Sequence, residues 1–317
     1  MRKFSSQAAV CALVALLGIT AAGCGQINAL KAKMAFKDAN EAYQQQDYRT
    51  AAQKYEQVIQ YNPNLTYAYF FLGNSYDNMY RAARRGEAAN DAMLTKAIAN
   101  YKKSAEVEQD PKIKKLALEY LVAAYGPDKL NDPAQAEPVV QRLIQLDPSD
   151  PANYFALAKI YSDNGEYDKA EEQYLKARDV KPNDPAVYMQ LAGFYNSQGQ
   201  FDKTMEALNA RAQKEPNNPE AYYTIATYYW EKAYRDFTTP EAEKMKYVQA
   251  GLQAVDKAIQ LKPDYFEALT YKNLLLRVEA NLEKNPQKQQ QLLKEADQYR
   301  DKAQEIRAKQ RTGAASE

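Results

Sequence analysis

The chain has 317 residues, with 42 Lys and Arg against 41 Asp and Glu, so its formal net charge is +1. It contains no histidine, only two cysteines and 11 scattered glycines, which removes the usual general base, thiolate metal sites and a glycine-rich phosphate loop. This composition predicts a protein that is not an enzyme and needs no metal or cofactor. The nearly neutral charge also argues against nucleic acid as a partner.

The first 23 residues have the composition of a signal peptide. Arg2 and Lys3 give a positive start, and residues 8–19 form an apolar stretch too short to span a bilayer. The AAGC run that ends at Cys24 resembles the lipobox of bacterial lipoproteins, although that family usually has Leu at the place of Ala21. The resemblance implies cleavage before Cys24 and lipidation of its sulfur. The alternative is an ordinary secretory leader cut after an alanine.

Cleavage would leave residues 24–31 as a lipidated N-terminus and short linker. Loss of the two basic leader residues would leave 40 basic against 41 acidic residues, a formal charge of −1. Cys11 would leave with the leader, so the exported part would have no disulfide and would depend on packing alone. Gly25 after the lipidated cysteine resembles the pattern that lets a lipoprotein leave the inner membrane. This implies the periplasmic face of an outer membrane, with the outer face of a plasma membrane as the alternative.

A period of 34 residues organises the chain from Ala32 onward. It is clearest in the phrases DPSDP, KPNDP and EPNNP, whose first prolines are Pro148, Pro182 and Pro216. A fixed period of this length is typical of a stacked array of helix pairs, in which no unit buries its apolar face alone.

The unit that begins at Asp150 shows two amphipathic helices. Tyr154, Ala158 and Tyr161 lie on one helical stripe, and a second stripe follows Gly165. Asp150 is placed to cap the first helix. This pattern resembles the tetratricopeptide repeat, and the resemblance covers about residues 29–310. It implies an all-α solenoid, a right-handed superhelix of antiparallel helix pairs.

The spacing of the boundary prolines predicts six to seven units over residues 32–286. Two intervals exceed the period, which places insertions near residues 78–95 and 231–248, between the two helices of a unit. Each insertion either lengthens both helices or forms a protruding loop. Residues 287–310 carry one apolar stripe and are predicted to form a C-terminal capping helix. Residues 311–317 are predicted to be a disordered tail.

First helices of tetratricopeptide arrays line a concave groove, and the residue after their leading aromatic points toward it. The resemblance assigns this position to Phe36, Phe70, Phe155, Met189 and Tyr223. Such an apolar row predicts a groove that binds a peptide segment with hydrophobic anchors. Alternatively, these side chains fill the space between neighbouring first helices.

Two further groups of residues are candidates for partner contacts. Trp230, the only tryptophan, lies among tyrosines and is predicted to be an interface anchor, with core packing as the alternative. Arg81, Arg84 and Arg85 form the only compact basic run, in the first insertion. They are either a solvated surface or a contact for anionic headgroups or an acidic partner.

These features predict a membrane-anchored, non-enzymatic scaffold that positions another envelope protein or complex through its groove. The chain resembles the tetratricopeptide lipoproteins that assist pilus secretins, and equally those that are adaptors for cell-wall hydrolases or polysaccharide export. The alternative function is a ligand-binding solenoid that recognises glycan or peptide fragments. The excess of 26 Tyr over 9 Phe would suit sugar stacking, but tetratricopeptide cores also use tyrosine heavily.

Overall fold

The computed structural model describes residues 7–313, with side chains from residue 25 to residue 310. Every regular element in this range is a helix. The helices are α1 (Gln7–Gln44), α2 (Tyr48–Tyr61), α3 (Tyr67–Met79), the short 3-10 helix η1 (Ala82–Arg84), α4 (Ala88–Val107), α5 (Pro111–Tyr125), α6 (Pro133–Leu146), α7 (Pro151–Asp163), α8 (Tyr167–Val180), α9 (Pro185–Ser197), α10 (Phe201–Lys214), α11 (Pro219–Arg235), α12 (Glu241–Leu261), α13 (Phe266–Leu282) and α14 (Pro286–Gly313).

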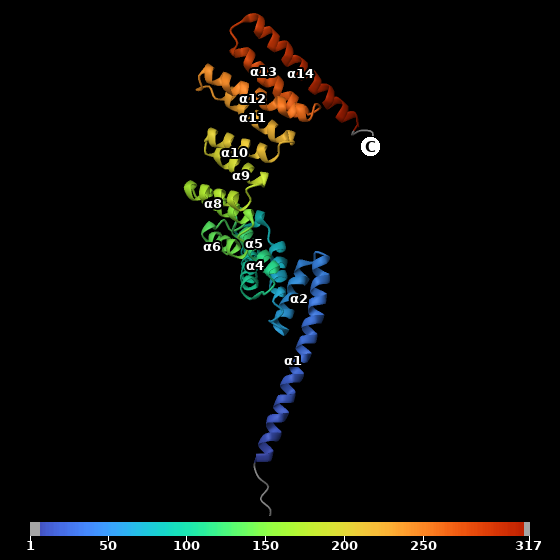
Figure 1. Ribbon diagram of the computed structural model, residues 1–317. Coiled ribbons are helices and arrows are strands. Elements are labelled where there is room, and N and C mark those ends of the chain that lie inside the picture. Colours follow the sequence, from blue (N-terminus) through green and yellow to red (C-terminus); the bar gives the residue numbers. More distant parts are fainter. Residues whose placement is uncertain (1–6, 314–317) are drawn as a thin grey trace, which may run out of the picture. The chain divides into compact units, whose positions relative to one another are not determined.

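The helices follow one another as hairpins (Figure 1). The chain forms two compact units, residues 1–170 and 171–317, with the boundary inside α8. In the first unit α1 contacts α2, α3 contacts α4, and α5 contacts α6; in the second, α9 contacts α10, α11 contacts α12, and α13 contacts α14. The predicted all-α solenoid is confirmed. The helix predicted as a C-terminal cap is α14, the second helix of the last pair.

Helix α1 is continuous through the predicted leader boundary. Residues 24–31, which we expected to be a short linker, are helical. Residues 311–313 of the predicted tail are helical, because α14 continues to Gly313. The basic start of the predicted leader and residues 314–317 of the predicted tail lie outside the described residues. Among the described residues, none of the helices combines the length and apolarity needed to cross a membrane.

The repeated phrases at the unit boundaries cap the first helices. The side chains of Asp150, Asp184 and Asn218 each accept a hydrogen bond from the backbone N–H two residues later, at 3.0, 2.9 and 3.0 Å. A proline follows each cap at the start of the helix, where its missing N–H leaves no hydrogen bond unmade. The predicted cap at Asp150 is confirmed.

Tyrosine hydroxyls connect successive helices with the same period. The leading tyrosine of a first helix donates to the carbonyl of the proline that ended the previous helix, and a later tyrosine of the same helix donates to a glutamate of the preceding second helix. The bonds are Tyr154 to Pro148 (3.1 Å), Tyr188 to Pro182 (2.7 Å), Tyr222 to Pro216 (3.3 Å), Tyr161 to Glu137 (2.8 Å) and Tyr195 to Glu171 (2.9 Å). These tyrosines therefore have a structural role, which weakens the compositional argument for sugar binding.

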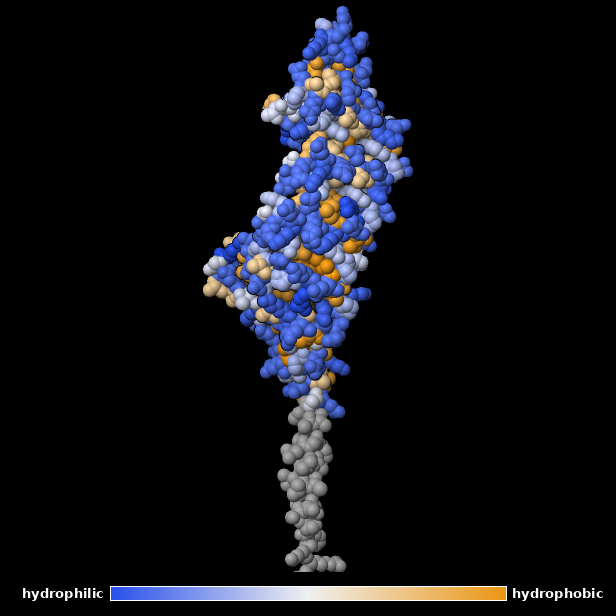
Figure 2. Space-filling view, turned by 60° about the vertical axis from the view of Figure 1, so that its left-hand side comes forward, coloured by the Kyte–Doolittle hydropathy of each residue, from blue (hydrophilic) through white to orange (hydrophobic). Residues whose placement is uncertain are grey.

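The apolar stripes of the helices face inward. Ala158 and Ala170, predicted to be small because helices approach closely there, are completely buried. On the face shown in Figure 2, hydrophobic residues appear as short strips within a largely hydrophilic surface. This is the surface that amphipathic helices leave when their stripes pack together.

The two predicted insertions have different structures. In the first, α3 keeps 13 residues, residues 80–87 form a loop that contains η1, and α4 has 20 residues. In the second, α11 has 17 residues and α12 has 21, and a short turn joins them. The regular pair α9 and α10 has 13 and 14 residues. The first insertion is thus a loop with a longer second helix, and the second insertion lengthens both helices.

Candidate functional site

The predicted lipidation site, Cys24, lies within α1. Its side chain is outside the described residues. The signal peptide and the lipid anchor therefore stay predictions.

The predicted groove residues of the first unit are Phe36, Phe70 and Phe155. Phe70 is only 8% exposed and packs against Phe71 and Tyr120, with ring centroids 5.4 and 5.5 Å away. It fills the core between helices, which is the packing alternative, and does not line an open groove. Phe36 is half-buried and meets the Tyr67 ring edge-on at 4.9 Å. Phe155 is half-buried on α7.

Met189 and Tyr223 occupy the predicted groove position in the second unit, and both are half-buried. The sulfur of Met189 accepts from Nη1 of Arg211 at 2.9 Å. Arg211 is itself buried and forms an ion pair with Glu215 at 3.1 Å. Met189 is therefore part of a packed polar contact between α9 and α10, and its surface is only partly available to a partner.

Tyr223 and Trp230 are joined by rings from α13 and the preceding turn. Tyr223 lies 5.3 Å from Tyr265 and 5.4 Å from Tyr271, centroid to centroid. Trp230 meets the same Tyr271 edge-on at 5.4 Å and stacks on Tyr234 at 5.1 Å. We call these five rings, Tyr223, Trp230, Tyr234, Tyr265 and Tyr271, the α11–α13 aromatic face. It exists because α11 and α13, both first helices, contact each other directly.

The aromatic face is half-buried and opens toward the end of α11. Four of its rings have intermediate exposure, while Tyr234 is 55% exposed. Phe237, in the turn after α11, is 88% exposed. Tyrosine and tryptophan are enriched at protein interfaces, so this face is a candidate binding surface.

Burial also changes the chemistry of Tyr223. Loss of solvent raises the pKa of its phenol to about 12, and the neighbouring phenols of Tyr271 and Tyr265 contribute to the increase. The Tyr223 phenol therefore stays protonated into the alkaline range. A protonated phenol beside packed rings can contact apolar groups of a partner and donate a hydrogen bond.

The sequence predicts Trp230 and Tyr223 as partner contacts, but not the two rings that join them. Tyr265 precedes α13 and Tyr271 lies on it, and neither occupies the predicted groove position. The position of Tyr271 between Trp230 and Tyr223 follows from the packing of α13 on α11, which the repeat spacing alone does not specify.

The basic run of the first insertion is exposed, and each arginine has a contact within the chain. The contacts are Arg81 Nη1 to the carbonyl of Asn78 (2.7 Å), Arg84 to the carboxylate of Glu87 (2.5 Å) and Arg85 Nη2 to the carbonyl of Pro127 (3.2 Å). These contacts hold the side chains close to the loop. A role in binding headgroups or an acidic partner stays a prediction.

Among the described residues there is no group of three or more His, Cys, Asp or Glu side chains that could hold an ion.

The fold and the repeat spacing define a solenoid of stacked helix pairs. The family description "tetratricopeptide repeat" matches the sequence at residues 36–78 and again at residues 129–193. The chain therefore contains tetratricopeptide repeats, and its fold is that of a tetratricopeptide solenoid. No curated protein matches the sequence.

Solved structures of tetratricopeptide proteins resemble the chain. A tetratricopeptide protein from Cytophaga hutchinsonii is 16% identical with a TM-score of 0.56, over 82% of this chain and 93% of that one. A structure of MamA protein is 20% identical with a TM-score of 0.46, over 66% of this chain and 98% of that one. PilW, described as a type IV pilus biogenesis factor, is 16% identical with a TM-score of 0.41, over 76% of this chain and 95% of that one. The first of these supports the fold; identities this low say nothing about function.

Proposed function

We propose that this protein is a non-enzymatic scaffold that binds a segment of another protein on the α11–α13 aromatic face. The observation that carries the proposal is the set of five touching rings that ends in the exposed Tyr234. Rigid aromatic side chains give a partner a large contact area at low cost in conformational entropy. A solenoid holds them in place because each helix is braced by its neighbours.

A partner segment that fits this face would carry apolar side chains and would have backbone groups free to form hydrogen bonds. The face is built of aromatic rings, and a further exposed aromatic side chain, Phe237, lies in the turn after α11. An extended or helical segment with hydrophobic anchors satisfies this surface. In this proposal the partner is another protein of the bacterial envelope.

We also propose that Cys24 carries a lipid anchor and that the protein is attached to the envelope membrane, at the periplasmic face of an outer membrane. The AAGC run before Gly25 supports this. Two or three acyl chains bind a bilayer far more firmly than one. Cys24→Ser should move the protein from the membrane fraction to the soluble fraction of its cells without changing its melting temperature. Wild-type protein found chiefly in the soluble fraction would disprove the anchor.

Partner capture tests the aromatic face. Tyr234→Ala should weaken capture of the cross-linked or co-purified partner roughly thirtyfold, because truncating an interface aromatic costs about 2 kcal/mol. Its melting temperature should stay close to that of the wild type, since Tyr234 is 55% exposed. A Trp230 variant would not separate binding from stability, because Trp230 also packs on Tyr271.

The matched control is Tyr167→Ala on α8, which truncates a tyrosine of similar exposure, 47%, outside the aromatic face. It should capture the partner as the wild type does. Equal losses in both variants, or full capture by Tyr234→Ala, would show that the face is not the binding surface.

A further inference from the structure

A second candidate site lies in the first unit, independent of the aromatic face. A cavity of about 470 Å³ is lined by the first insertion loop, by α4 and by the segment that joins α5 to α6. Leu94, Ile98 and Leu130 give it an apolar lining. Its volume is within the usual range of small-ligand sites, about 300–1,000 Å³.

The hydroxyl of Tyr80 is the unusual feature of this cavity. Tyr80 is 6% exposed and lines the cavity beside Leu94. Its oxygen is buried and has no hydrogen-bond partner among the described residues. A buried polar atom without a partner costs free energy, so such atoms are rare in folded proteins. A ligand that drew this hydroxyl toward the cavity would supply its missing hydrogen bond.

Charges of both signs surround the apolar lining. Arg85, Lys102 and Lys129 are the cations, and Asp91 and Asp132 are the carboxylates. Lys129 is already paired, since its amine contacts the carboxylate of Asp77 outside the lining. The other four form no ion pair among the described residues, although Arg85 donates to the Pro127 carbonyl, Asp91 accepts from the Gly86 N–H and Asp132 caps α6. Groups of both signs without an ionic partner favour a ligand that carries one charge of each sign.

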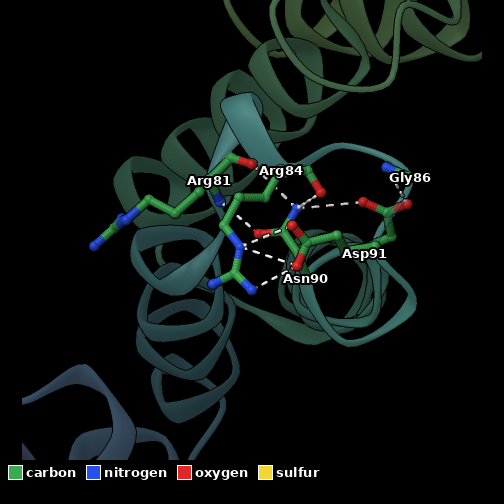
Figure 3. Close-up of polar contacts among 6 residues, drawn as sticks. Arg81, Arg84, Gly86, Asn90 and Asp91 are labelled. Atoms are coloured by element: carbon green, nitrogen blue, oxygen red, sulfur yellow. Dashed lines mark hydrogen bonds and ion pairs between the residues drawn. The ribbon is translucent and has the colours of Figure 1, made fainter.

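The loop that supplies Tyr80 and Arg85 is rigidly built (Figure 3). The Asn90 side chain lies at its centre, accepting from the backbone N–H of Arg81 at 2.8 Å and donating to the carbonyls of Arg81 and Arg84, both at 3.1 Å. The carboxylate of Asp91 accepts from the N–H of Gly86 at 2.9 Å. One wall of the cavity is therefore set before a ligand arrives, which lowers the entropic cost of binding.

We propose that this cavity binds a short zwitterionic peptide, two or three residues long, with apolar side chains. The apolar side chains would lie on Leu94, Ile98 and Leu130. The terminal carboxylate would contact Lys102 or Arg85, and the terminal ammonium would contact Asp91 or Asp132. The Tyr80 hydroxyl would bond to a peptide carbonyl.

Calorimetric titration of the full chain with the dipeptide Leu-Leu tests this site. Leu-Leu should bind with saturable heat, whereas the N-acetylated and the C-amidated dipeptides should each bind at least about tenfold more weakly, because each loses one charged hydrogen bond. Tyr80→Phe should bind Leu-Leu roughly fivefold to tenfold more weakly, with a melting temperature equal to or above that of the wild type. Lys102→Gln, an exposed change, should also weaken binding.

Lys103→Gln is the control, since Lys103 lies on the same helix, pairs with Glu106 at 3.2 Å and does not line the cavity. It should bind as the wild type does. Three results would overturn the site: absence of saturable heat with Leu-Leu, equal binding of the blocked dipeptides, or unchanged binding by Tyr80→Phe. A lowered melting temperature for Tyr80→Phe would also overturn it, because the hydroxyl would then have a partner within the protein.

Discussion

The two insertions add nearly the same length to the repeat but build different structures. The first gives an ordered polar loop between α3 and α4, with α4 lengthened. The second lengthens both α11 and α12 and leaves only a short turn between them. Because the lengths are similar, the amino-acid sequence of an insertion determines whether it forms a loop or lengthens the helices.

The residues of each insertion explain its structure. Gly86 adopts φ +94° in the first, a left-handed conformation that ends a helix, and Asn90 satisfies the loop's backbone groups. The second insertion contains no glycine between residues 231 and 248. It has ion pairs of Lys232 with Asp236 and of Arg235 with Glu231, at helical i,i+4 spacing.

The extra helical turn of the second insertion has a functional consequence. The regular first helices α7 and α9 have 13 residues, whereas α11 has 17. Tyr234 lies in the additional turn, and Trp230 stacks on it. The aromatic face thus depends on the lengthened helix, while the cavity of the first unit depends on the ordered loop.

Asn90→Ala should have the largest effect on stability. It removes three hydrogen bonds from backbone groups of the first loop, and Asn90 is only 7% exposed, so the free energy of unfolding should fall by about 3 kcal/mol. Protease cleavage within residues 80–87 should increase. Asn100→Ala on the same helix, whose amide bonds only to the Lys96 carbonyl, is the control and should change little. Equal stability of the two variants would mean that Asn90 does not organise the loop.

Substitution of a glycine at a close helix contact should have the second largest effect, and the effect should differ between the two helix pairs that carry insertions. A Cβ at Gly73 would lie 2.9 Å from the buried ring of Tyr101 and 3.2 Å from the Ala97 carbonyl, so Gly73→Ala should lower the unfolding free energy by about 2 kcal/mol. At Gly251 a Cβ would meet two methyl groups of Leu275 at 2.9 and 3.2 Å and the Cβ of Tyr229 at 3.2 Å. These three nearest atoms belong to side chains, whereas the Ala97 carbonyl at Gly73 belongs to the backbone, so Gly251→Ala should cost less, about 1 kcal/mol. Urea denaturation measures both. A larger loss at Gly251 would contradict the packing described for the two pairs.

In the aromatic face, replacing Tyr223 should have a smaller effect on the free energy of unfolding, and only at high pH. The folded state raises the pKa of Tyr223 from 10 to about 12, so its burial contributes stability that is complete below pH 10 and is lost as the pH rises toward 12. Tyr223→Phe should therefore flatten the fall of stability between pH 10 and pH 12. An identical alkaline profile for the variant would show that Tyr223 is solvated.

Much of this fold can be predicted from the sequence, because the repeat period marks where each helix pair begins and ends. The cap at Asp150 and the buried alanines at 158 and 170 follow from local spacing. Local spacing does not predict how exposed a groove residue is, since its exposure depends on how neighbouring first helices approach one another. Phe70 is buried by rings from other helices. The unpartnered hydroxyl of Tyr80 likewise depends on packing that no sequence pattern records.

Site-specific photo-cross-linking in cells tests whether a partner docks on the α11–α13 aromatic face. A photoreactive phenylalanine analogue would replace Tyr234 in one variant and Tyr167 in another, two positions of similar exposure. We expect a discrete protein adduct from position 234 and none from position 167. An adduct from position 167 alone, or the absence of any adduct at position 234, would contradict it.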